Sequence, residues 1–267
     1  MKNMARAILI TLLTGVFCFS GFKLFGMSEG YIQEAQLKDG LAAYRPAAVN
    51  DNQPLNPNAS EPALTGSMLA VSQNSATAVL PDAPVPDVVN QNIFDLQNEI
   101  NRDVAGWLTI PGTQIDYPFV KGIDNAYYIN RDLHGNDALA GTIFMDERNA
   151  ADFSDFNNIL YGHNMRNGTM FGELPLYADE WYFNNNQTGT LYLPYGTYTL
   201  EIFAYMVVRS DDGVIYDPAV TSEAFFDYVR DNARNYREPA ANEIIVTLSA
   251  CAYEFDGARA VVIAGVL

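Results

Sequence analysis

The sequence is nearly without cysteine: its 267 residues include only Cys18 and Cys251. Cys18 lies inside an apolar N-terminal run, so no intramolecular disulfide is expected, and a disulfide-stabilised scaffold is excluded. Cys251 is therefore a lone thiol. It is either a buried structural side chain, which is common for free cysteine, or a nucleophile, because the thiolate is a reactive form.

Basic residues and histidines are also scarce. Lysine and arginine number 15 against 32 acidic residues, which gives a formal net charge of −17 and argues against a nucleic-acid partner. Two histidines and one cysteine outside the N-terminal run form no ligand set of recognisable spacing, so neither a metal nor another cofactor is expected. Acidic pairs such as Asp211-Asp212 are interpreted as solvated loop charges, with calcium binding as the weaker alternative.

The only long apolar run is at the N-terminus. Residues 7–22 are apolar or small and follow Lys2 and Arg6, a pattern typical of a membrane-spanning helix with a cytoplasmic N-terminus. We therefore expect residues 1–26 to form a signal anchor, and the protein to be a single-pass cell-membrane protein with its remainder outside the cell. A cleaved signal peptide is the alternative, but Gly26-Met27-Ser28 is a poor cleavage site.

The composition changes twice after the apolar run. Residues 27–87 are rich in proline, asparagine, alanine and serine with few aromatics, which predicts a largely disordered extracellular spacer. Residues 88–267 hold nearly all the aromatics and both tryptophans, and are predicted to form one folded domain. An unpaired thiol outside the cell is open to oxidation, so its retention favours a chemical role for Cys251.

The folded domain is predicted to be mostly β. Helical periodicity indicates helices at 93–102 and 222–236. Apolar and alternating runs bounded by turn residues predict short strands at 104–120 (two strands around Pro111-Gly112), 141–145, 158–161, 190–194, 197–208, 243–251 and 259–267. Many short strands and few helices favour a mostly antiparallel barrel or sandwich.

Cys251 lies at the end of a predicted strand and is followed by Arg259 at the start of the next one. The turn at Asp256-Gly257 allows the two strands to pair and brings the guanidinium beside the thiol. Arginine does not act as a base in proteins, but its fixed donors can stabilise a carbonyl or an oxyanion. A salt bridge from Arg259 to Glu254 or Asp256 is the structural alternative.

A cysteine nucleophile needs an acid/base partner, and His163 is the better of two candidates. It follows the predicted strand 158–161 and a glycine, so it lies at a strand end, whereas His134 sits in a turn among charged residues. Ser249 is two residues before Cys251 on the same strand, so it shares a face with the thiol and is a candidate for lining a substrate groove.

These residues occur within motifs that resemble the class B sortases. The motifs are Thr247-Leu-Ser-Ala-Cys251 with Arg259, and Tyr161-Gly-His-Asn-Met-Arg-Asn-Gly-Thr-Met-Phe-Gly172, with supporting stretches at 106–118, 124–128 and 141–149. The family commonly has threonine where this chain has Ala250. The resemblance covers residues 93–267 and includes the N-terminal anchor. It implies an eight-stranded sortase-type β-barrel, with N-terminal helical structure and a long helix before the cysteine strand.

The resemblance also implies a reaction. A sortase-like enzyme is a cysteine transpeptidase that cleaves a C-terminal sorting signal of secreted proteins through a thioester, then transfers the acyl group to an amine of a cell-wall precursor. Cys251 would be the nucleophile, His163 the acid/base and Arg259 the stabiliser of the substrate carbonyl, which makes 88–267 the catalytic domain. Two alternatives remain open: a cysteine endopeptidase that hydrolyses the acyl-enzyme, and a non-catalytic anchored binding domain.

Overall fold

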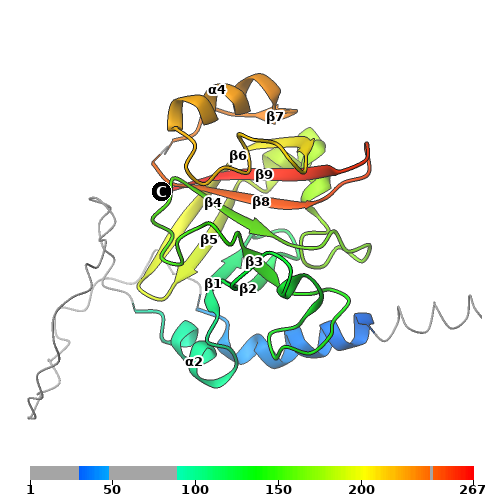
Figure 1. Ribbon diagram of the computed structural model, residues 1–267, viewed down its shortest axis with the longest axis vertical. Helices are drawn as coiled ribbons and strands as arrows, with labels where there is room; N and C mark the ends of the chain where they lie inside the picture. The colour runs from blue at the N-terminus through cyan, green and yellow to red at the C-terminus, as the bar shows by residue number, and fades with distance from the viewer. Residues whose placement is uncertain (1–29, 48–88, 241–242) are drawn as a thin grey trace, which may run out of the picture.

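The computed structural model describes residues 30–47, 89–240 and 243–267. Its body is a β-barrel with helices on opposite sides: α4 (Ser222–Asn232) lies on one side, and α2 (Gln91–Glu99) lies on the other beside the helix of residues 30–41 (Figure 1). The predicted mostly β domain is confirmed.

Eight strands close the barrel, as the resemblance implies. Neighbouring strands follow the order β5, β1, β2, β3, β4, β8, β9, β6, and a further pairing between β5 and β6 closes the ring. The strand bounds are β1 Val104–Thr109, β2 Asp116–Val120, β3 Ile143–Met145, β4 Asn157–Tyr161, β5 Thr188–Leu193, β6 Gly196–Arg209, β8 Ile245–Cys251 and β9 Ala258–Val266. The two-residue β7 (Asn235–Tyr236) extends the sheet beyond β6.

Most strand pairs are antiparallel, but β2–β3 and β4–β8 are parallel. The β4–β8 pair is central to the site, because parallel neighbours end at the same edge of the sheet. Tyr161 at the end of β4 lies opposite Ser249 near the end of β8. The segments that follow these two strands therefore begin side by side, although they are far apart in the sequence.

The apolar core has three parts. Side chains such as Leu108, Phe119 and Leu248 form a cluster with members from most barrel strands, which fits a barrel filled by its inward-facing residues. A second cluster packs α4 against the outside of β6 and β9, with Phe225 buried among its members. The third packs α2 against the first strands, with Ile93 fully buried. Both helices thus cover parts of the outer surface of the barrel.

The helix before the cysteine strand is shorter than predicted. α4 begins after Thr221, whose side chain caps the backbone N–H of Ala224, but it ends at Asn232 and not at Tyr236. Tyr236 instead pairs with Ala204 as part of β7, and its ring meets Phe203 edge to face. Sheet pairing and aromatic packing thus outweigh helical periodicity in this segment.

Several smaller helical elements were not predicted. They are the 3-10 turns η1 (Ala42–Tyr44), η2 (Tyr128–Asn130) and η3 (Leu174–Ala178), and the short α3 (Glu180–Asn185). α3 is capped by the Asp179 carboxylate, which accepts from the backbone N–H of Tyr182. These elements are too short to carry a helical period that a sequence pattern could reveal.

Residues 30–47 fall within the predicted spacer, yet they form a helix over 30–41 that contacts the barrel. Leu41 is buried against α2, Lys38 Nζ lies 4.4 Å from the ring centroid of Tyr117, and Arg45 Nε lies 2.9 Å from an Asp116 carboxylate oxygen. The rest of the predicted spacer, residues 27–29 and 48–87, lies outside the described residues.

The predicted membrane-spanning helix and cell-membrane location are corrected by the structure. Within residues 30–47, 89–240 and 243–267, no helix combines the length and the apolar character needed to cross a bilayer. The segment proposed as the anchor, residues 1–26, lies outside the described residues.

Candidate active site

Cys251 and Arg259 lie directly opposite each other on the paired strands β8 and β9. The connecting chain turns at Gly257, whose φ of +75° suits glycine, and Ala252 N–H donates to the Ala258 carbonyl at 2.9 Å. The predicted return of the chain through Asp256-Gly257 therefore occurs, and it places thiol and guanidinium at the same end of the barrel.

The thiol of Cys251 is free and its residue is exposed, so it is not the buried structural cysteine that composition left open. The guanidinium of Arg259 is half-buried and donates through Nη1 to the Ala258 carbonyl at 3.0 Å. Within the part of the chain that the structure describes, none of the ion pairs involves Arg259, so the alternative salt bridge to Glu254 or Asp256 does not form. Its other N–H donors lack a carboxylate partner there.

His163 is held by a backbone carbonyl from a distant loop. Its Nε2 lies 2.6 Å from the Ile129 carbonyl oxygen. A carbonyl oxygen can only accept a hydrogen bond, so Nε2 must carry a proton and Nδ1 is the nitrogen that gains or releases one. The contact therefore fixes both the orientation of the ring and the tautomer of its neutral form.

Gly141 makes this contact sterically possible. Its φ is +59°, and a Cβ at this position would lie 2.3 Å from the Ile129 carbonyl oxygen. Real Cβ atoms do not approach an oxygen so closely, so a larger residue would displace the acceptor of the His163 hydrogen bond. A glycine at position 141 thus supports the ring orientation of His163.

Cys251, His163, Arg259 and Ser249 all line one cavity of about 200 Å³. The other lining residues are Asn125, Ile129, Phe144, Tyr161, Gly162, Ser210, Tyr216 and Ala250. The structure therefore brings together all four predicted site residues. His134 lines a different cavity, and among the described residues no three His, Cys, Asp or Glu side chains are grouped to hold a metal ion.

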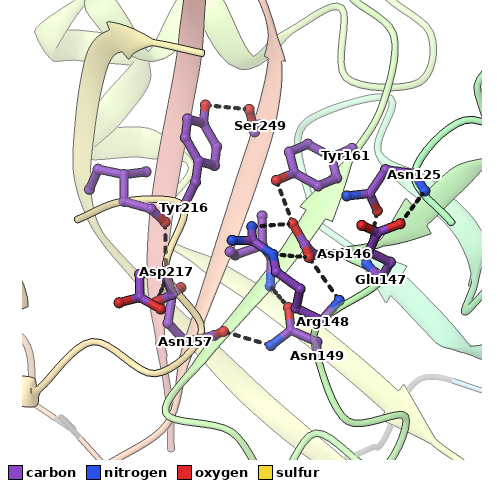
Figure 2. A network of polar contacts seen from close by, with 12 residues as sticks. Asn125, Asp146, Glu147, Arg148, Asn149, Asn157, Tyr161, Tyr216, Asp217 and Ser249 are labelled. Atoms are coloured by element: carbon purple, nitrogen blue, oxygen red, sulfur yellow. Dashed lines mark hydrogen bonds and ion pairs between the residues drawn. The ribbon is translucent and has the colours of Figure 1, made fainter. Parts of the chain in front are cut away.

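Ser249 meets a tyrosine that the sequence analysis missed. The Ser249 hydroxyl is buried and lies 2.8 Å from the hydroxyl of Tyr216 (Figure 2). Burial raises the pKa of Tyr216 to about 12, although the Ser249 hydrogen bond and the charge of Arg259 act to lower it. Tyr216 is therefore protonated at neutral pH, and the pair offers neutral hydroxyls on one side of the cavity.

Tyr161 forms another part of the cavity wall and was also missed as a site residue. Its ring stacks on Tyr216 with centroids 6.0 Å apart, and its hydroxyl donates to Asp146 at 2.8 Å. Burial acts to raise the pKa of Asp146, but hydrogen bonds from Arg148 and Tyr161 outweigh it and lower the pKa. The resulting carboxylate anchors Tyr161, the last residue of β4 (Figure 2). His163 follows two residues later in the chain.

The chain matches known proteins along most of its length. A profile of the sortase domain matches residues 108–266. A curated relative, sortase B of Listeria monocytogenes, is 30% identical over 262 residues, which cover 96% of this chain and 93% of the relative.

Solved structures show the same likeness. A sortase B–substrate complex of Staphylococcus aureus superposes with a TM-score of 0.61 at 28% identity, over 67% of this chain and 86% of that one. A Streptococcus pyogenes class B sortase involved in pilus biogenesis has a TM-score of 0.60 at 32% identity, over 65% of this chain and 97% of that one.

Proposed function

Because this chain belongs to the sortase family, and is a class B sortase and thus a cysteine transpeptidase, we propose that Cys251, His163 and Arg259 carry out its acyl transfer. The arrangement of these three residues is the main support for this proposal. The exposed Cys251 thiol lies opposite an arginine without a carboxylate partner among the described residues, at a cavity that His163 also lines.

In the first half of the reaction, the Cys251 thiolate attacks a backbone carbonyl carbon of a sorting signal near the C-terminus of a secreted protein. A C–S bond forms and the carbonyl oxygen becomes negative, and the Arg259 donors stabilise that charge. His163 Nδ1–H then protonates the departing nitrogen, the C–N bond breaks, and a thioester remains on Cys251.

In the second half, an amine of a cell-wall precursor attacks the thioester carbonyl. His163 Nδ1 accepts a proton from the attacking nitrogen, the C–S bond breaks, and Cys251 leaves as a thiolate. The proton that His163 gave to the leaving amine is thereby replaced, so one turnover restores the starting state. Arg259 stabilises the same oxygen in both halves, since both pass through a tetrahedral intermediate.

In this scheme Ser249 helps to bind the peptide substrate in the cavity. Its hydroxyl is engaged by Tyr216, so the two residues act together as a fixed pair of hydroxyls. A peptide substrate presents backbone amides and carbonyls, which such neutral donors and acceptors can bind without competing for the charge of Arg259.

Transfer and hydrolysis are separated by one assay. Wild-type enzyme is incubated with a mixed library of sorting-signal peptides and a primary amine, and the products are identified by mass spectrometry. We expect an amide between peptide fragment and amine, with the peptide mass carried on Cys251 as an intermediate. A hydrolysed acid as the only product, at saturating amine, would instead support the cysteine endopeptidase alternative.

The Arg259→Lys variant tests the role of the guanidinium. Lysine keeps the charge but lacks the planar fork of donors, so we expect kcat to fall by about 10²-fold, the loss typical for one oxyanion donor. Arg209→Lys is the matched control, because Arg209 lies on neighbouring β6 in an exposed pair with Asp211, and it should behave as wild type. Wild-type turnover by Arg259→Lys would refute the proposed carbonyl clamp.

A further inference from the structure

The parallel pairing of β4 with β8 ends in an unusual way beside Cys251. The ladder runs to Tyr161 opposite Ser249, and the next rung is the Gly162 N–H donating to the Ser249 carbonyl at 3.1 Å. In a regular parallel ladder, the N–H two residues further along would donate to the carbonyl two residues further along the partner. That rung would join the backbone N–H of Asn164 to the carbonyl of Cys251.

The side chain of Asn164 makes this bond in place of its backbone. Asn164 Nδ2 donates to the Cys251 carbonyl at 2.8 Å. The backbone of Asn164 instead pairs with Met170, and Phe171 N–H donates to the His163 carbonyl at 3.0 Å. The segment that follows β4 thus separates from β8 after Gly162 and folds back on itself. The Asn164 amide keeps one hydrogen bond to β8, the strand that carries Cys251.

We infer that Asn164 is a positioning residue that sets the distance between Cys251 and His163, an inference that rests on the proposed function. Cys251 and His163 lie on segments that separate after Gly162. Asn164 follows His163 directly in the chain. One hydrogen bond therefore ties the residue next to the acid/base to the backbone of the nucleophile.

This role differs from that of an asparagine in a Cys-His-Asn triad. There the asparagine orients the histidine ring, as in papain-like proteases. Here the ring is oriented by the Ile129 carbonyl at 2.6 Å, while the Asn164 amide is bound to Cys251. Asn164 therefore acts on the backbone of the nucleophile and not on the imidazole.

The bond matters because Cys251 is the last residue of β8 and is exposed. Strand ends fray, and β9 holds Cys251 from one side only. Without the Asn164 amide, the Cys251 backbone loses its hydrogen bond to the segment that follows β4. The Cys251 Sγ is then less restrained relative to His163. A displacement of about 1 Å at reacting atoms can cost about 10²-fold in rate.

Two variants test the inference. Asn164→Ala removes the donor, and Asn164→Asp keeps the size of the side chain but places an acceptor against the Cys251 carbonyl. For both we expect kcat to fall by roughly 10- to 100-fold, with the KM for the donor peptide and the melting temperature little changed. Asn232→Ala is the matched control, because Asn232 Nδ2 also donates to a backbone carbonyl, at 2.9 Å, but on α4.

A second measurement needs no substrate. The rate of Cys251 alkylation by iodoacetamide is followed against pH in wild type, Asn164→Ala and His163→Ala. If Asn164 positions the pair, the Asn164→Ala profile moves toward that of His163→Ala, whereas partial unfolding would alter the reactive fraction and leave the profile of the folded enzyme unchanged.

The outcomes separate this inference from the proposed function. Wild-type kcat and a wild-type alkylation profile in Asn164→Ala would overturn the positioning role while leaving the proposed function intact. Absence of any acyl-enzyme in wild type would overturn the proposed function, and the alkylation profiles would still decide whether Asn164 couples Cys251 to His163.

Discussion

Replacing Cys251 with alanine is expected to abolish both the acyl-enzyme and the transfer product. The thioester needs the sulfur, and neither of the serines that line the cavity, Ser210 and Ser249, is paired with Arg259 in the strand register. Loss of a nucleophile that acts as a unit with its acid/base leaves only residual catalysis, so turnover should drop by about 10⁴-fold or more. The fold should persist, because the residue is exposed at a strand end.

The measurement is mass spectrometry of the intact enzyme after incubation with donor peptide, together with the yield of amide product. Cys18→Ala provides the control, since it removes the only other cysteine of the chain and should leave the product yield at the wild-type level. An acyl adduct of undiminished intensity on the Cys251→Ala enzyme would show that another residue is the nucleophile and would contradict the proposal.

The pairing of Cys251 with Arg259 was predictable because it depends on local sequence. Two apolar runs flank Asp256-Gly257, and a short connection of this kind favours an antiparallel pair. Residue alternation then placed Ser249 on the face of Cys251, and Ser249 does line the cavity. What alternation could not reveal is Tyr216, whose hydroxyl reaches Ser249 from a loop between β6 and α4.

The position of His163 was predictable only in part. The strand and glycine before it indicate a strand end, but its proximity to Cys251 depends on the parallel pairing of β4 with β8, between which three further strands, α3 and α4 intervene. Such long-range pairing leaves no local pattern. The Ile129 carbonyl and the Asn164 amide were likewise invisible, because a backbone acceptor has no residue type and asparagine is common in loops.

Two errors in the helices have the same origin. The period of 222–236 is helical, yet Tyr236 gains sheet pairing with β6, which is a tertiary contact. Residues 30–41 have a composition that merges with the spacer, yet Lys38 and Leu41 find partners on the barrel and on α2. In both segments the decisive interactions come from residues distant in the sequence, where local propensity is a weak guide.

Replacing His163 with alanine is expected to lower kcat for a peptide donor by about 10²- to 10⁴-fold, the usual contribution of a positioned general acid/base. The reason lies in the leaving group, because an amine cannot depart from the tetrahedral intermediate without a proton. Donor KM should change little, since Ser249 and Tyr216 still line the cavity and keep their hydrogen bond.

A donor with an ester in place of the scissile amide sharpens this test. An alcohol leaves more readily than an amine, so acylation of Cys251 by the ester should be much less sensitive to His163→Ala than acylation by the amide. His134→Ala is the matched control, because it removes the other histidine, which lines a different cavity, and both donors should react at wild-type rates. Equal losses on ester and amide would contradict proton donation to the leaving group and would assign His163 instead to activation of the thiol, a step that both donors share.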